Sequence, residues 1–310
     1  MNGAEALLRT LVDSGVEVCF ANPGTSEMHF VAALDRVPRM RAVLGLFEGT
    51  VTGAADGYGR MTGKPAVTLL HLGPGLGNGF ANLHNARRAR TPIVNVIGEH
   101  ATYHQRFDAP LHSDIDAVAG ALEGWTRRCA STSHVGRDGA DAVAAASDPP
   151  GRVANLILPA DLSWSDGAEP APPRPRSGLH PVPDDAVSAA VEALRSGEPA
   201  VLLLGDGALR EPGLVAAARV AASTGARVIA EVFPARMQRG AGLPAVPRLA
   251  YPIDVAQRQL AGTKHLILAG ALAPVSFFGY PGLASELTPP DCAIHVLSEP
   301  GQDVVAALDD

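Results

Sequence analysis

The chain has 310 residues, of which 46% are hydrophobic, and its 25 basic and 32 acidic residues give a net charge of −7. This apolar content is sufficient for about two domains, each with its own core. The acidic balance, with no basic run longer than Arg87-Arg88, argues against nucleic acid as a partner. The three cysteines, Cys19, Cys129 and Cys292, are odd in number and far apart. We therefore expect reduced thiols in a cytoplasmic protein, not a disulfide framework.

The N-terminal residues form an amphipathic pattern without the character of a signal peptide. Residues 265–285 carry no Asp, Glu, Lys or Arg for long enough to resemble a membrane span. Pro274, Gly279 and Pro281 interrupt this run, so it predicts a buried strand followed by a loop. We expect no membrane partner.

The first 165 residues alternate between helix and strand signals. Asn2 and Glu5 have the spacing of a capping box, and Gly15 ends the helix that follows. Apolar runs predict strands at 16–21, 43–47, 66–72, 93–97 and 153–158, and helical patterns lie between them near 26–36, 49–61, 78–89 and 138–146. Strands buried on both faces and alternating with helices indicate a parallel sheet in a doubly wound α/β domain.

A second α/β pattern follows a proline-rich linker. Residues 166–183 cannot pack as a regular element because of their many prolines. Beyond them, strands are predicted at 200–204, 227–230, 265–269 and 293–297, and helices at 184–195, 212–223 and 253–261. The sequence thus predicts two doubly wound parallel-sheet domains, at 1–165 and 184–310, joined by the linker.

The most informative stretch is 43–63, where an apolar strand leads into a helix rich in glycine and alanine. Glu48 lies at this junction, where a carboxylate is poorly solvated. The residues leave two interpretations open: Glu48 complements the positive N-terminus of the helix, or it serves a chemical purpose. The small residues of the helix would let another chain or a flat ligand approach its backbone closely.

Five motifs, in the same order, resemble the pyrimidine-binding domain of thiamine-diphosphate enzymes, in the branch of benzoylformate decarboxylase and acetolactate synthase. They span residues 20–159. The motifs are Phe20-Ala-Asn-Pro-Gly-Thr-Ser-Glu27, Phe47-Glu48 with Asp56-Gly-Tyr-Gly-Arg60, Leu70-His-Leu-Gly-Pro-Gly-Leu-Gly-Asn78, Thr91-Pro-Ile-Val-Asn-Val-Ile-Gly98 and Val153-Ala-Asn-Leu-Ile-Leu-Pro159.

The resemblance implies a cofactor-binding role for several of these residues. In the family, a carboxyl group hydrogen-bonded to N1′ of the cofactor pyrimidine activates the neighbouring amino group, and Glu48 matches that position. Apolar surroundings favour the neutral form of a carboxyl group, as this role requires. The resemblance also implies that two turns bind the cofactor. The turn after the first strand consists of Asn22, Pro23 and Gly24. The glycine-rich turn consists of Gly73, Pro74 and Gly75, and Asn78 would cap the helix that follows it.

His71 ends a buried strand, where a histidine is either a satisfied core residue or a proton donor and acceptor. The benzoylformate decarboxylase branch has its active-site histidine at the matching position. Thr25 matches a serine that contacts the substrate carboxylate in that branch. Leu111 and His112 fall in the loop that lines the substrate pocket of relatives, although a solvated loop histidine is the simpler alternative for His112.

Two further patterns invite a metal interpretation. His100, His104 and Asp108 recur every four residues, but they follow a strand and lack an apolar stripe, so a helical metal site is not expected. Gly205-Asp206-Gly207 resembles the first half of the family's Mg²⁺ motif, but no paired asparagines follow it. We expect Asp206 to close a strand-to-helix turn instead.

The implied function is thiamine-diphosphate-dependent cleavage of a 2-keto acid. The product would be an aldehyde, as His71 favours, or an acetohydroxy acid made by carboligation, an outcome that Gly73-Pro74-Gly75 keeps open. In the family, a third domain holds the diphosphate through Mg²⁺, and we expect residues 1–310 to lack it and to be inactive alone. FAD, which the acetolactate synthase branch binds, has no clear motif here.

Non-catalytic alternatives remain open from the sequence. The chain is either a truncated fragment that folds but cannot hold the cofactor, or one subunit of a split enzyme whose diphosphate-binding domain is a separate chain. As partners, the resemblance implies a second copy in a homodimer or homotetramer, or that separate diphosphate-binding chain.

Overall fold

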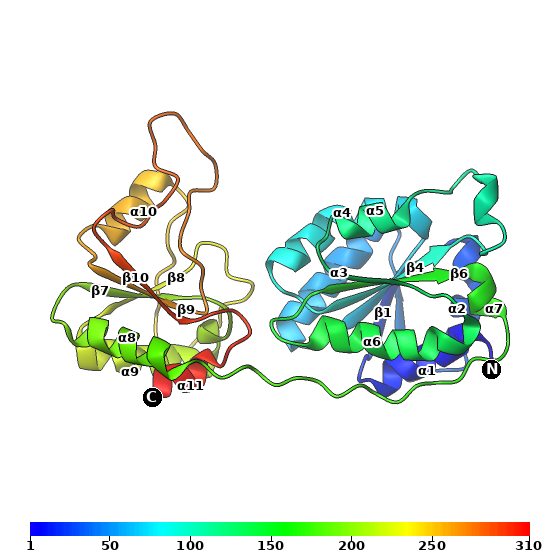
Figure 1. The fold of residues 1–310 in the computed structure, drawn as a ribbon, viewed down its shortest axis with the longest axis horizontal. Helices are drawn as coiled ribbons and strands as arrows, with labels where there is room; N and C mark the ends of the chain where they lie inside the picture. Colours follow the sequence, from blue (N-terminus) through cyan, green and yellow to red (C-terminus); the bar gives the residue numbers. More distant parts are fainter. The chain divides into compact units, whose positions relative to one another are not determined.

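A computed structural model describes residues 1–310 as two compact units, Met1–Ser177 and Gly178–Asp310, and the boundary between them in the sequence falls within the proline-rich stretch (Figure 1). Each unit has its own parallel sheet, as the sequence predicts.

The first unit is built on a six-stranded sheet in the order β2-β1-β3-β4-β6-β5, with all neighbours parallel. Its strands are β1 (Val18–Asn22), β2 (Arg41–Leu44), β3 (Ala66–Leu70), β4 (Ile93–Glu99), β5 (Trp125–Arg128) and β6 (Val153–Pro159). Its helices are α1 (Gly3–Asp13), α2 (Met28–Leu34), α3 (Glu48–Thr62), α4 (Leu72–Arg88), α5 (Ile115–Gly120), α6 (Val135–Ser147) and α7 (Ala160–Trp164).

Helices cover both faces of this sheet (Figure 1). Leu7 and Leu11 of α1 pack with Val94 and Leu156 in one core. On the other face, α3, α4 and α5 enclose a second core around Leu70, Leu76, Leu83 and Ile97. Burial on both faces explains why the sequences of β3, β4 and β6 are nearly continuous apolar runs.

One row of polar side chains crosses the buried sheet. Thr68 Oγ1 donates to Asn95 Oδ1 (2.6 Å), Asn95 Nδ2 donates to Asn155 Oδ1 (2.8 Å), and Asn155 Nδ2 donates to Thr126 Oγ1 (3.3 Å). These residues are register partners on β3, β4, β6 and β5. Because a shift by one residue would bury these groups without partners, the row specifies the strand register.

The predicted capping residue Asn2 is confirmed, since its Oδ1 accepts a hydrogen bond from the Glu5 amide (3.0 Å). The Glu5 carboxylate does not return to Asn2 but pairs with Arg9 (2.9 Å) and Arg36 (3.3 Å). Cys19 and Cys129 are buried free thiols, and burial raises the pKa of Cys19 to about 12, so it is a packing group.

The second unit has a four-stranded parallel sheet in the order β10-β9-β7-β8. Its strands are β7 (Ala200–Leu204), β8 (Arg227–Ala230), β9 (His265–Ala269) and β10 (Ala293–Ser298), and its helices are α8 (Asp184–Arg195), α9 (Glu211–Thr224), α10 (Ile253–Leu260) and α11 (Val304–Asp309). Asp206 begins a 3-10 turn between β7 and α9, as expected for a strand-to-helix connection. No helix in the chain combines the length and apolarity that crossing a membrane requires.

Candidate functional site: the carboxyl edge of the first sheet

The sequence-predicted residues gather where the strand order of the first sheet reverses. The chain passes from β1 outward to β2 and then returns to β3 on the other side of β1. Asn22 and Leu70, the last residues of β1 and β3, are register partners at this point. In doubly wound sheets, ligands bind in the crevice at the carboxyl ends of the strands flanking such a reversal.

Glu48 is the first residue of α3 and is only 5% exposed. Its Oε2 accepts a hydrogen bond from Asn78 Nδ2 at 2.9 Å. Its Oε1 has no hydrogen-bond partner in the protein. The helix N-terminus and the Asn78 amide therefore hold one side of the carboxyl group and leave the other oxygen for a ligand.

Gly75 brings the α4 backbone against that free oxygen. A Cβ on Gly75 would lie 2.9 Å from Glu48 Oε1 and 3.3 Å from the carbonyl carbon of Leu70, so only glycine fits without a shift. Gly73, Pro74 and Gly75 form the first turn of α4, which begins at Leu72. The prediction of a separate glycine-rich turn before a helix at 78 was therefore wrong, because the helix begins directly after β3.

Asn78 consequently does not cap a helix. It lies within α4, six residues after Leu72, the first residue of the helix, and its side chain reaches Glu48 instead. The cap position belongs to His71, which is followed by Leu72 in the left-handed region (φ 51°). A leucine in this conformation costs free energy and is retained where surrounding contacts enforce it, often at functional sites.

His71 is held by a buried carboxylate, Glu27, for which the sequence pattern indicates no role. Glu27, 3% exposed, lies with its Oε2 2.8 Å from His71 Nδ1, and the same oxygen accepts the Gly24 amide at 2.7 Å. Ser26 Oγ donates to the other oxygen, Oε1, at 2.7 Å, and lies 3.5 Å from His71 Nδ1. The carboxylate thus fixes the ring orientation and requires a proton on Nδ1, which leaves Nε2 for other partners.

Two glycines make room for this pair. A Cβ on Gly24 would lie 2.3 Å from Cε1 and Nδ1 of the His71 ring, and one on Gly98 would lie 1.6 Å from Glu27 Oε1. Glycine at both positions is therefore a steric requirement of the His71–Glu27 pair.

The predicted substrate residues are not brought together to the same degree. Thr25 is exposed at the start of the 3-10 turn Thr25–Glu27 and makes no hydrogen bond to His71; the neighbouring hydroxyl is that of Ser26. Leu111 is 43% exposed, and His112 pairs with Asp108 (3.2 Å). Asn22 and Pro23 are partly buried at the end of β1.

The loop carrying Leu111 and His112 nevertheless begins and ends at the site. At its start, the loop follows the strand end that contains Gly98, the glycine packed against Glu27. At its end, Ser113 packs against Gly73, since a Cβ on Gly73 would lie 1.8 Å from Ser113 Oγ. The Ser113 hydroxyl is buried without a hydrogen-bond partner. Within this loop, the rings of His100 and His104 are 5.7 Å apart, but no group of three or more His, Cys, Asp or Glu side chains is placed to hold a metal ion.

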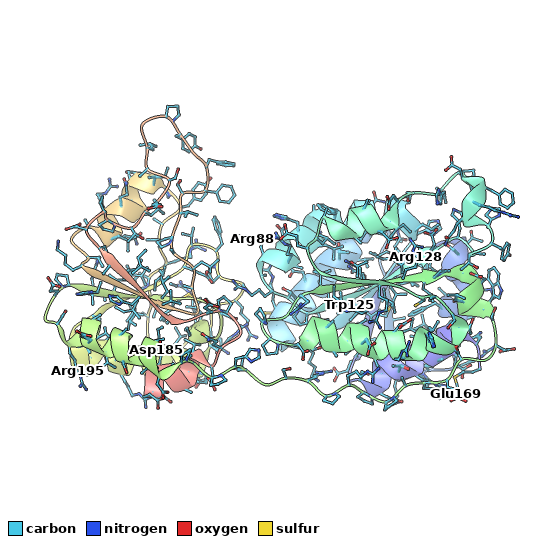
Figure 2. All side chains as sticks on the ribbon, in the orientation of Figure 1. Arg88, Trp125, Arg128, Glu169, Asp185 and Arg195 are labelled. Atoms are coloured by element: carbon cyan, nitrogen blue, oxygen red, sulfur yellow. The ribbon has the colours of Figure 1, made fainter.

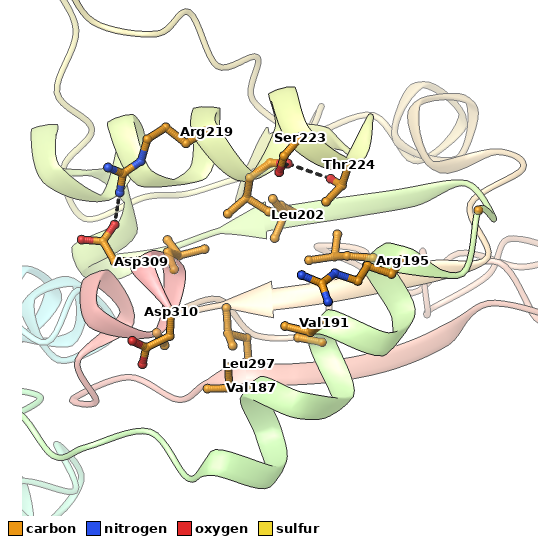
Figure 3. A pocket seen from close by; sticks show the side chains of 16 residues that line it. Val187, Val191, Arg195, Leu202, Arg219, Ser223, Thr224, Leu297, Asp309 and Asp310 are labelled. Carbon is orange, nitrogen blue, oxygen red and sulfur yellow. Dashed lines mark hydrogen bonds and ion pairs between the residues drawn. The ribbon is translucent and has the colours of Figure 1, made fainter.

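A cavity of about 840 Å³ lies in the second unit between α8, α9 and α11 (Figure 3). Its floor includes Leu202 and Leu297, and its rim includes Arg195 and the ion pair of Arg219 with Asp309. It contains none of the residues that the sequence indicated as functional.

Comparison with known proteins finds a family match within the first unit and two similar curated proteins. Residues 1–120 match the family described as "Thiamine pyrophosphate enzyme, N-terminal TPP binding domain". The chain is 62% identical over 312 residues to the putative acetolactate synthase large subunit IlvX of Mycobacterium tuberculosis, covering all of this chain and 60% of that protein. It is 35% identical over 160 residues to benzoylformate decarboxylase of Pseudomonas aeruginosa, covering 51% of this chain and 29% of that protein.

Solved structures share the fold over the whole chain. A putative thiamin diphosphate-dependent enzyme from Mycobacterium smegmatis superposes with a TM-score of 0.86 at 26% identity, covering 100% of this chain and 62% of that one. The 4-hydroxybenzoylformate decarboxylase of Rhodococcus jostii RHA1 gives 0.85 at 22% identity, with 100% and 61% coverage. The family match thus lies within the first unit, and the chain spans about 60% of the length of the Mycobacterium tuberculosis relative and of these two solved structures.

Proposed function

We propose that this chain is the pyrimidine-binding part of a thiamine-diphosphate-dependent enzyme that acts on 2-keto acids. The observation that carries the proposal is the Glu48 carboxyl group, buried at a helix N-terminus with Oε2 bound by Asn78 and Oε1 unpartnered beside Gly75. A planar heterocycle with a basic ring nitrogen fits this arrangement, because its nitrogen would pair with Oε1 while its ring packs on the glycine backbone.

Thiamine diphosphate, when bound, supplies an electron sink for the bond between the carboxylate and the keto carbon. The role of this chain is to hold and orient the pyrimidine and to exchange a proton at Glu48 Oε1. The chain offers no group of three or more His, Cys, Asp or Glu side chains that could hold the Mg²⁺ that the family uses.

His71 is the proposed proton donor and acceptor toward substrate. Glu27 occupies Nδ1 at 2.8 Å, so the free Nε2 is the atom that would exchange a proton.

Decarboxylation to an aldehyde and carboligation to an acetohydroxy acid both fit this site. The His71–Glu27 pair favours the aldehyde, because a fixed proton donor competes with addition to a second keto acid. We propose that the diphosphate is held by a domain supplied either in the same polypeptide or by a separate chain.

The test is product analysis with an enzyme that contains residues 1–310 and retains the cofactor. We expect benzoylformate or a related 2-keto acid to release CO₂ and an aldehyde, and Glu48→Gln to abolish both products. Unchanged turnover in Glu48→Gln would contradict the proposed role of the site.

A further inference from the structure

The two histidines at the open edge of the second sheet form a contact that no part of the proposed function uses. His265 is the first residue of β9, and His295 lies on β10, the edge strand. His265 Nδ1 and His295 Nε2 are 3.1 Å apart, while the ring centres are 5.2 Å apart. The two nitrogens therefore face each other along the line joining the rings, as in a hydrogen bond.

This geometry suits a shared proton better than a metal ion. Two imidazoles that chelate an ion direct their lone pairs to a third point, whereas these nitrogens point at one another. His265 Nε2 lies 3.0 Å from Glu198 Oε2, which places a hydrogen on that nitrogen. In the neutral state, His265 Nδ1 is then the acceptor and His295 Nε2 the donor.

The pair accommodates one additional proton but not two. The first added proton binds His295 Nδ1, and the single hydrogen between the two facing nitrogens can then lie on His265 Nδ1, where Glu198 balances the charge. A second proton would place N–H groups on both facing nitrogens and remove the acceptor between them. Consistent with this, burial and the neighbouring His265 hold the pKa of His295 below its usual value.

Few other charges face the pair. Glu192 of α8 lies near His295 and opposes the lowering of its pKa. Lys264, beside His265, is paired with Asp291. Glu198 is 56% exposed, so solvent screens its charge and it cannot fully compensate a second proton.

We propose that His265 and His295 form a pH-sensitive lock that holds the edge strand β10 against β9 and α8, and that double protonation below neutral pH releases this edge. The direction in which stability changes with pH follows from the difference in pKa between the folded and unfolded states. Because the folded-state pKa of His295 is lowered, the stabilisation is complete above the ordinary histidine value of 6.5 and is lost as the pH falls through the folded-state pKa. The repulsion of two unit charges 5.2 Å apart, even at the dielectric constant of water, corresponds to about a fourfold change in an opening equilibrium.

Hydrogen exchange of the β10 amides, measured by mass spectrometry on the full chain between pH 7 and 5, tests the proposal. After correction for intrinsic exchange rates, protection of β10 should fall about fourfold or more relative to β7 as the pH decreases. His295→Gln keeps a side-chain amide that can donate to His265, and it should abolish the pH dependence while leaving protection at pH 7 near that of the parent.

The matched control is His180→Gln, because His180 is the one other histidine of the second unit and is exposed. This variant should retain the full pH dependence. Equal loss of β10 protection on acidification in His295→Gln and in the parent chain, or no loss in the parent chain, would overturn the proposal.

Discussion

Gly98→Ala tests whether the position of the Glu27 carboxylate depends on the absence of a side chain at Gly98. The new Cβ would lie 1.6 Å from Glu27 Oε1, 2.5 Å from Cδ and 2.9 Å from Cγ, so the carboxylate has to leave its position. It would lose its contacts with the Gly24 amide, Ser26 and His71, at 2.7, 2.7 and 2.8 Å. Hydrogen bonds to a charged group contribute about 1.5–3 kcal/mol each, and partial relaxation reduces their sum. We expect a destabilisation of about 3 kcal/mol.

Urea unfolding followed by tryptophan fluorescence measures this change in the first unit alone. Both tryptophans of the chain, Trp125 and Trp164, belong to that unit, and Trp125, the first residue of β5, is labelled in Figure 2. Gly77→Ala is the control: it lies within α4, and its Cβ would meet no atom within 4 Å. That variant should be stabilised by about 0.5–1 kcal/mol, because alanine is the better helix former.

A double-mutant cycle identifies the cause of the destabilisation. If Gly98→Ala acts by displacing the Glu27 carboxylate, it should cost less than about 1 kcal/mol in a Glu27→Ala background. A Gly98→Ala protein as stable as the parent, or an equal cost in both backgrounds, would refute the steric argument.

Two further variants test separate parts of the account. In an enzyme containing residues 1–310, His71→Ala should lower turnover by roughly 10²–10⁴-fold, as expected for loss of a general acid–base; a change confined to thermal stability would instead indicate a core histidine. Asn95→Ala should destabilise the first unit by about 2–4 kcal/mol, because it leaves Thr68 and Asn155 without their buried partner. The exposed Asn85 is the control, and Asn85→Ala should fall within about 0.5 kcal/mol of the parent in the same urea experiment.

Most elements could be predicted from the sequence because their signals are local. The strands at 200–204, 227–230 and 265–269 and the helix at 184–195 agree with the structure residue for residue. Strand β5 was missed because Trp125–Arg128 is half-buried and contains two arginines, so it lacks an apolar run. The short helices α5, α7 and α11, of five or six residues, are too brief for a helical period to appear.

The candidate site was predicted less completely, because its contacts join distant segments. Glu48 stood out as an acid between apolar and small residues, but its contact with Asn78 depends on α4 starting at Leu72. Glu27 lay within a recognised motif, and its spacing from Gly24 is that of a capping box, yet its contact with His71 joins residues 44 positions apart. The exclusion of any larger residue at Gly98 is visible only in three dimensions.

The exchange of the thiazolium C2 proton for deuterium measures most directly whether the Glu48 carboxyl group activates a bound thiamine cofactor, as we propose. In an enzyme that contains residues 1–310 and holds thiamine diphosphate, exchange should be fast. Glu48→Gln, which retains the size of the side chain but not its titrating proton, should reduce it to the rate of the free cofactor. Glu17→Gln, at an exposed carboxylate paired with Lys64, should leave it unchanged. Fast exchange of cofactor bound to the Glu48→Gln enzyme would contradict the account.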